Sequence, residues 1–233
     1  MVNFMIEAFP IVSIIVPAYD EERTIGNVLS ELLHIKDTIP SMEIIVVDDG
    51  STDRTALIAS HFSSVRLIKH EKNMGKGAAL QTGFRAAHGK VIVVQDADME
   101  YFPREIPNII RPILTGNADV VFGSRFRKKP CGMSLAHFLG NIILSAVASI
   151  LYSESITDVM TGYKAFSNEV LKSVDIREKG FLVEVELTGQ ILRNSWRFKE
   201  VPICYMYRPD GVSKIRNRDG LKSLMHLLVQ PFQ

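Results

Sequence analysis

The sequence predicts an α/β fold with a mostly parallel central sheet. Along the first half of the chain, short segments rich in valine and isoleucine alternate with segments whose apolar residues recur at helical spacing. Acidic or glycine-rich motifs follow most of the short segments. Alternating strands and helices form β-α-β units, whose right-handed crossovers bring the carboxyl ends of the strands to one edge. We therefore expect a doubly wound sheet with its ligand site at that edge.

The first half of the chain supplies four expected strands and three helices between them. The strands are residues 11–16, 44–47, 65–68 and 91–94, and the helices are residues 25–33, 56–59 and 78–87. Pro17 closes the first strand, and three acids at 20–22 suit the positive end of the helix that follows. A glycine-rich turn at 73–77 leads into the third helix.

The second half adds one expected strand and four helices. The strand is residues 118–123, and the helices are residues 104–114, 134–152, 180–194 and 221–229. Residues 134–152 form the most apolar segment, which falls short of the roughly 20 residues of a bilayer span. This segment is either a core helix or a helix that lies in a membrane interface, beside a basic cluster at 125–129.

Composition limits the class of protein. With 233 residues, 46% hydrophobic and 23% charged, the chain is expected to form one domain, residues 1–233. Two cysteines make neither a disulfide framework nor a metal site, which indicates a reducing compartment, and no signal peptide is visible. Residues 1–120 carry a net charge of −5 and residues 121–233 a net charge of +6. An acidic half beside a basic half suits a site that holds a metal on one side and a phosphate on the other.

Asp96 and Asp98 directly follow the apolar strand at 91–94. Carboxylates at positions i and i+2 of an extended chain point to the same side. Such a pair suits a hard cation such as Mg²⁺ or Mn²⁺, with water and ligand phosphate completing its shell. The alternative is an acidic loop that caps the helix beginning near Arg104.

Polar motifs at four strand ends should converge on one rim of the sheet. They are Asp20, Asp48 with Asp49, the turn at 73–77, and Asp96 with Asp98. No Gly-x-Gly-x-x-Gly follows the first strand, and no Gly-x-x-x-x-Gly-Lys-Ser/Thr motif is present. A rim of carboxylates suits hydrogen bonds to a base and ribose, with a metal carrying a diphosphate.

The ordered motifs resemble those of family-two inverting glycosyltransferases. They are Pro17-Ala18-Tyr19-Asp20-Glu21-Glu22, Asp48-Asp49-Gly50-Ser51-x-Asp53, Asn73-x-Gly75-Lys76-Gly77 and Gln95-Asp96-Ala97-Asp98. The resemblance implies a Rossmann-like, nucleotide-sugar-binding fold of the A type, with residues 10–124 as the nucleotide-sugar half and residues 125–233 as the acceptor half. It implies a substrate-binding set of Pro17, Tyr19, Glu21, Asp48, Asp49, Lys76, Gln95 and Asp96, with the metal at Asp96 and Asp98.

Within that family, the chain resembles the group of dolichyl-phosphate mannose and glucose synthases. The similar stretches include Gln95 to Tyr101, Phe122 to Phe126 and the Asp158-x-x-Thr161-Gly162-Tyr163-Lys164 pattern that follows the hydrophobic helix. The resemblance implies a lipid phosphate as acceptor, bound near an interfacial helix at 134–152. No nucleic-acid partner is expected.

The chemistry of the acceptor separates two hypotheses. A sugar hydroxyl must lose a proton as it attacks, so it needs a base, and Glu184 or Glu186 is the candidate. A phosphate monoester, with a second pKa of about 6, is already anionic at neutral pH and needs cations instead. Arg125, Arg208 and Lys214 are the expected cations, with Glu184 as base or as a residue that orients the sugar.

We therefore expect a metal-dependent hexosyltransferase. It would use a UDP- or GDP-linked sugar with Mg²⁺ or Mn²⁺ and invert the anomeric carbon, with Asp98, Arg125, Arg208 and Glu184 as the catalytic set. The preferred acceptor is a polyprenyl or dolichyl phosphate at the cytoplasmic face of a membrane. The alternatives are a hydroxyl acceptor with Glu184 or Glu186 as base, and a non-catalytic nucleotide-binding module.

Overall fold

A seven-stranded sheet forms the centre of the protein in the computed structural model, which describes residues 11–39, 41–128, 133–206 and 217–229. The strand order is β3-β2-β1-β4-β6-β5-β7. The strands are β1 Val12–Ala18, β2 Met42–Asp48, β3 Val65–Lys69, β4 Val91–Val94, β5 Val120–Ser124, β6 Lys164–Ser167 and β7 Phe198–Pro202. All neighbouring strands pair in parallel except β6, which runs antiparallel to both β4 and β5.

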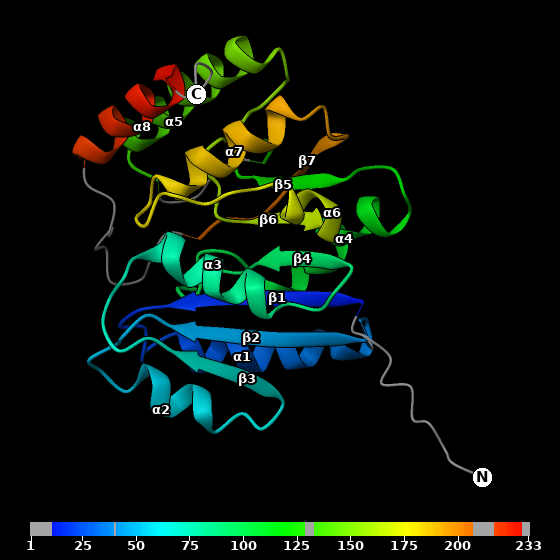
Figure 1. Ribbon diagram of the computed structural model, residues 1–233, viewed down its shortest axis with the longest axis vertical. Coiled ribbons are helices and arrows are strands. Elements are labelled where there is room, and N and C mark those ends of the chain that lie inside the picture. The colour runs from blue at the N-terminus through cyan, green and yellow to red at the C-terminus, as the bar shows by residue number, and fades with distance from the viewer. Residues whose placement is uncertain (1–10, 40, 129–132, 207–216, 230–233) are drawn as a thin grey trace.

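Helices cover both faces of this sheet (Figure 1). They are α1 Ile25–His34, α2 Thr55–Ser60, α3 Lys76–Ala86, α4 Ile106–Leu114, α5 Leu135–Tyr152, α6 Asn168–Lys172, α7 Val183–Arg193 and α8 Asn217–Val229, with short 3₁₀ turns at Ile35–Asp37 and Pro103–Glu105. One buried cluster joins α1 and α4 to one face, and a second joins α3, α6 and α7 to the other.

The expected α/β fold with a mostly parallel sheet is confirmed. All five expected strands and all seven expected helices occur, with ends that differ by a few residues. Strands β6 and β7 and the short helix α6 were not expected. Strand β6 is four residues long and begins with a lysine, and β7 carries Lys199 and Glu200 at its centre. Neither segment has the mainly apolar run of four or more residues that identified the other strands.

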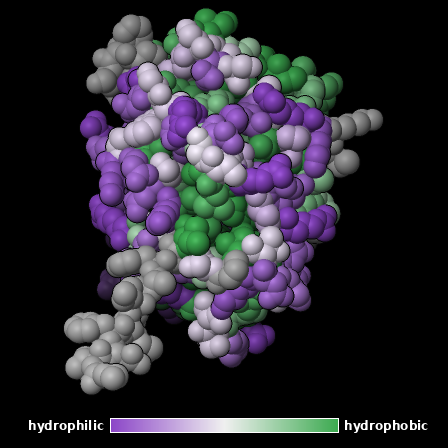
Figure 2. Space-filling view, turned by 90° about the vertical axis from the view of Figure 1, so that its right-hand side faces the viewer, coloured by the Kyte–Doolittle hydropathy of each residue, from purple (hydrophilic) through white to green (hydrophobic). Residues whose placement is uncertain are grey.

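Helix α5 lies largely on the surface, which does not support its interpretation as a core helix. Only 17% of this 18-residue segment is buried, chiefly through Leu144, Ser145 and Ala148. Among the described residues, α5 alone has the length and apolar composition of a membrane span, a match that core helices and signal sequences also give. Helix α8 packs against α5 and α7. Figure 2 shows hydrophobic side chains along the upper edge of the molecule, the end that carries α5 and α8 in Figure 1.

Candidate active site

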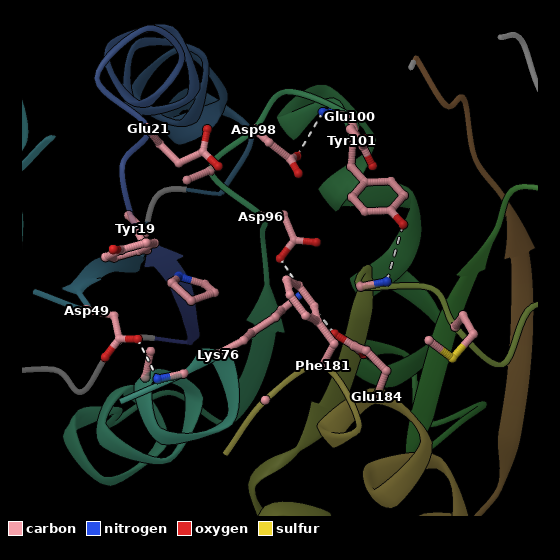
Figure 3. A pocket seen from close by; sticks show the side chains of 18 of the residues that line it. Tyr19, Glu21, Asp49, Lys76, Asp96, Asp98, Glu100, Tyr101, Phe181 and Glu184 are labelled. Carbon is pink, nitrogen blue, oxygen red and sulfur yellow. Dashed lines mark hydrogen bonds and ion pairs between the residues drawn. The ribbon is translucent and has the colours of Figure 1, made fainter. Parts of the chain in front are cut away.

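A cavity of about 350 Å³ opens at the carboxyl ends of β1, β2 and β4, where the strand-end rule places a ligand site. It is built mainly from the loops after these strands, the start of α3 and the start of α7 (Figure 3). Nine of the residues expected from the sequence line it: Pro17, Tyr19, Glu21, Asp49, Lys76, Asp96, Asp98, Arg125 and Glu184. The structure therefore brings together most of the expected site.

Lys76 lies between two acids at the centre of the cavity. Its ammonium is 2.6 Å from Asp96 Oδ1 and 2.9 Å from Glu184 Oε1 (Figure 3). Burial lowers the pKa of Lys76, but the two carboxylates outweigh it and raise that pKa above its ordinary value. Burial raises the pKa of Asp96, and the nearby carboxylates of Asp98 and Glu184 add to this effect while Lys76 opposes it.

Glu184 is held by a second lysine from the side away from the cavity. Lys164, at the start of β6, is fully buried and donates to Glu184 Oε2 and to the carbonyl of Thr161. Burial acts to raise the pKa of Glu184, but Lys164 and Lys76 together hold it below its ordinary value. Glu184 is therefore an ion-paired carboxylate at neutral pH. A base with a lowered pKa accepts protons poorly.

The charge of the cavity fits a divalent cation. Its described lining has six carboxylate residues, Glu21, Asp49, Asp96, Asp98, Glu100 and Glu184, but only two cationic residues, Lys76 and Arg125. A nucleotide diphosphate would add negative charge. No cluster of three or more metal-ligating side chains occurs in the described part of the chain. Asp96 and Asp98 would thus hold the ion together with phosphate and water oxygens, which is the usual coordination of Mg²⁺.

Asp49 lies at the other end of the cavity, where it forms hydrogen bonds with the glycine-rich turn and with His70. Its carboxylate accepts hydrogen bonds from the backbone N–H groups of Met74 at 3.0 Å and Gly75 at 2.7 Å. His70 Nδ1 lies 2.6 Å from Asp49 Oδ1, and His70 Nε2 lies 2.9 Å from the hydroxyl of Thr82. Asp49 thereby fixes the glycine-rich turn that enters α3.

The glycines of that turn allow another loop to approach. The N–H of Gly77 donates to the carbonyl of Lys179 at 2.7 Å. A Cβ at Gly77 would lie 1.9 Å from the carbonyl oxygen of Glu178, and a Cβ at Gly75, whose φ is +96°, would lie 2.2 Å from that of Lys179. The motif is therefore explained here by close packing against residues 177–180, which lead to Phe181 in the cavity wall.

Glu186 anchors the same loop and does not line the cavity. Its carboxylate accepts hydrogen bonds from the backbone N–H of Arg177, at 3.0 and 3.2 Å, and from that of Glu178 at 3.0 Å. Only 4% of Glu186 is exposed. The structure thus places Glu184 in the cavity and Glu186 behind it, although the two are adjacent candidates in the sequence.

Arg125 connects the cavity to the exposed helix α5. Asp158, which is fully buried, accepts from Arg125 Nε and Nη2 at 2.7 Å each, and Asn141 of α5 accepts from Nη2 at 3.4 Å. The guanidinium also lies over the ring of Tyr205, 5.4 Å from its centroid. Within the described residues, Nη1 makes no hydrogen bond. Asp158 raises the pKa of Arg125 despite its burial.

Two of the expected site residues that the structure describes do not line the cavity. Asp48 and Gln95 are buried, and the Gln95 amide donates to the carbonyls of Asp96 and Tyr101, so it supports the turn after β4. Arg208 and Lys214 lie outside the described residues. The sequence analysis missed several lining residues, namely Glu100, Tyr101, Met160, Gly162, Gly180 and Phe181. Glu100 continues the spacing of Asp96 and Asp98, which could have identified it, but no local signal identifies Phe181.

Comparison with known proteins agrees with this architecture. The family model "Glycosyl transferase family 2" matches residues 13–175. A UDP-N-acetylglucosamine–dolichyl-phosphate N-acetylglucosaminyltransferase of Methanococcus voltae is 32% identical, over 94% of this chain and 95% of that protein. A dolichol-phosphate mannosyltransferase of Pyrococcus furiosus is also 32% identical, over 93% of this chain and 62% of that protein.

Among solved structures, glucosyl-3-phosphoglycerate synthase from Mycobacterium tuberculosis, in complex with Mn²⁺, UDP and glucosyl-3-phosphoglycerate, is similar in fold. The TM-score is 0.75 at 23% identity, covering 95% of this chain and 80% of that one. The fold is that of an A-type glycosyltransferase. The chain belongs to glycosyl transferase family 2 and is a glycosyltransferase.

Proposed function

We propose that this protein transfers a hexose, with inversion, from a UDP- or GDP-linked sugar to a polyprenyl or dolichyl phosphate. The observation that carries the choice of acceptor is the state of Glu184, whose carboxylate is paired with both Lys76 and Lys164. Glu186, the other candidate base, is bound to backbone N–H groups behind the cavity. An acceptor phosphate is already anionic and needs neither residue as a base.

In this proposal the whole chain acts as one transferase domain. Pro17, Tyr19, Glu21 and Asp49 face the nucleoside, and Lys76 faces the diphosphate. Asp96 and Asp98 hold Mg²⁺ or Mn²⁺, which supplies Lewis-acid stabilisation of the leaving diphosphate. The names of the relatives support a lipid phosphate as acceptor.

The acceptor phosphate meets Arg125 in this proposal. Asp158 holds the guanidinium through Nε and Nη2, and the phosphate would contact Nη1. Asn141 joins the same guanidinium to α5, so a phosphate bound there would have its lipid tail beside an exposed apolar helix. Arg208 and Lys214 are proposed as further cations from the sequence alone.

The exposed side of α5 supports contact with the cytoplasmic face of a membrane. Leu139 is 49% exposed and Ile143 is 56% exposed. Replacing both with serine should abolish sedimentation with anionic vesicles and leave the melting temperature unchanged. The matched control is Leu57→Ser on α2, where the leucine is 50% exposed and should not contribute to vesicle binding. Equal sedimentation of all variants would exclude this helix as the membrane contact.

The acceptor is tested by transfer of labelled UDP- and GDP-hexoses, with Mg²⁺ or Mn²⁺, in detergent. Short-chain polyprenyl phosphate should yield product, whereas the matching polyprenol should yield none. Asp98→Asn should abolish transfer, and Asp37→Asn, in the 3₁₀ turn after α1, should not change it. At saturating donor, Glu184→Gln should still transfer to the phosphate. Product formed only with the polyprenol or a saccharide would reject the phosphate acceptor and restore the hydroxyl alternative.

A further inference from the structure

Lys164 is a charged residue that no part of the proposed reaction uses directly. It is fully buried and lies outside the lining of the cavity. Its ammonium lies 4.9 Å from the centroid of the Phe122 ring and is bonded to Glu184 and to the carbonyl of Thr161. A buried ion pair is seldom worth more to stability than well-packed apolar residues of similar size. The retention of this charge therefore calls for a reason besides stability.

The contacts of Lys164 lead to the centre of the cavity. Lys164, Glu184, Lys76 and Asp96 form a row of alternating charge in which each member contacts the next. The carboxylate of Glu184 uses Oε2 for Lys164 and Oε1 for Lys76. Lysine has a flexible stem, so the position of an ammonium depends on the anions around it. The position of Lys76 thus depends on a carboxylate that Lys164 holds from behind.

We propose that Lys164 is a positioning residue for donor binding, which fixes Glu184 and through it holds the Lys76 ammonium where the donor diphosphate docks. The inference rests on the proposed function, in which Lys76 faces the diphosphate. Lys164 is separated from the cavity by Glu184, so it acts on the diphosphate only through Lys76. The effect of removing Lys164 must therefore depend on the presence of Lys76.

A double-mutant cycle tests this dependence. Binding of UDP and of GDP, each with Mn²⁺, is measured by calorimetry for wild type, Lys164→Met, Lys76→Met and the double variant. Lys164→Met should weaken binding of the preferred diphosphate about tenfold in the wild-type background, and should have no further effect in the Lys76→Met background. A general structural role for Lys164 would produce the same loss in both backgrounds.

Two further variants control for folding. Lys164→Arg keeps the buried charge and should retain most of the affinity, while Glu184→Gln should reproduce the loss with Lys164 intact and should likewise lose its effect without Lys76. If Lys164→Met does not fold, the Glu184→Gln cycle decides the question. Three outcomes would overturn the proposal. They are unchanged affinity in the variants, equal losses in both backgrounds, and no binding of either diphosphate by wild type. Because this assay contains no acceptor, failure of lipid transfer alone would overturn only the acceptor assignment.

Discussion

Substitutions of Glu186 can distinguish between two roles for this residue, anchoring of the loop at residues 177–178 and general-base catalysis. Its carboxylate receives three short contacts from two backbone N–H groups, those of Arg177 and Glu178. Hydrogen bonds to a charged group contribute about 1.5–3 kcal/mol each to stability. Water can reach the partly buried donors once the side chain is gone, so we expect Glu186→Ala to lower the free energy of unfolding by about 2–4 kcal/mol. Glu186→Gln keeps one acceptor oxygen and should lose about half as much.

The assay is urea denaturation followed by circular dichroism, together with steady-state transfer. Glu154→Ala is the matched control because this glutamate is exposed, and its replacement should change stability by less than about 0.5 kcal/mol. If Glu186 were the general base, Glu186→Gln would abolish transfer while its unfolding curve matched that of wild type. That result would refute the anchoring role, whereas a stability loss graded from Gln to Ala would support it.

Three further predictions follow from the same geometry. Gly77→Ala should destabilise the protein by at least about 2 kcal/mol and weaken donor binding, because its Cβ would lie 1.9 Å from the Glu178 carbonyl oxygen. Thermal unfolding measures the loss of stability. The control is Gly140→Ala, because a Cβ at Gly140 would have nothing within 4 Å. Asp158→Ala should cost about 3–5 kcal/mol in urea unfolding, because it leaves a buried guanidinium without its anion. The pKa of Glu184 is lowered in the folded protein, so its ionisation stabilises the fold above the ordinary pKa of 4.5, and this stability is lost as pH falls through the lower folded value. The stability difference between wild type and Glu184→Gln should therefore be constant from pH 8 to about pH 5 and shrink below about pH 4, as measured by urea unfolding across that range.

The strand-end motifs could be predicted because they follow from local patterns and one rule of topology. Each expected strand is a mainly apolar run, and parallel strands bring their carboxyl ends to one edge. Asp49, Lys76, Asp96 and Asp98 therefore meet in the cavity as expected. Whether α5 is buried or exposed could not be predicted in the same way. An apolar helix of 18 residues has the same composition whether it packs in a core or lies on the surface, and only its tertiary neighbours decide.

The supporting contacts could not be predicted because they join distant parts of the chain. Gly77 meets Lys179 and Lys164 meets Glu184 through the packing of α7 against the sheet. Strand β6 enters between β4 and β5 in the antiparallel sense, and no local pattern specifies that insertion. Glu184 and Glu186 show the consequence most clearly. Both are acids in the first turn of one helix, but they face different surroundings and have different partners.

The pairing of the cationic side chains bears on how a phosphate ligand is held. In the described lining, Lys76 is neutralised by two carboxylates and Arg125 by Asp158. Neither side chain therefore offers an uncompensated positive charge to a nucleotide diphosphate, and the remaining acids repel one. Within the described lining, favourable electrostatics for the donor would therefore come from the divalent ion that we propose at Asp96 and Asp98, with Lys76 contributing direction more than net charge. On this reasoning, chelation should weaken binding of the diphosphate itself, in addition to slowing transfer.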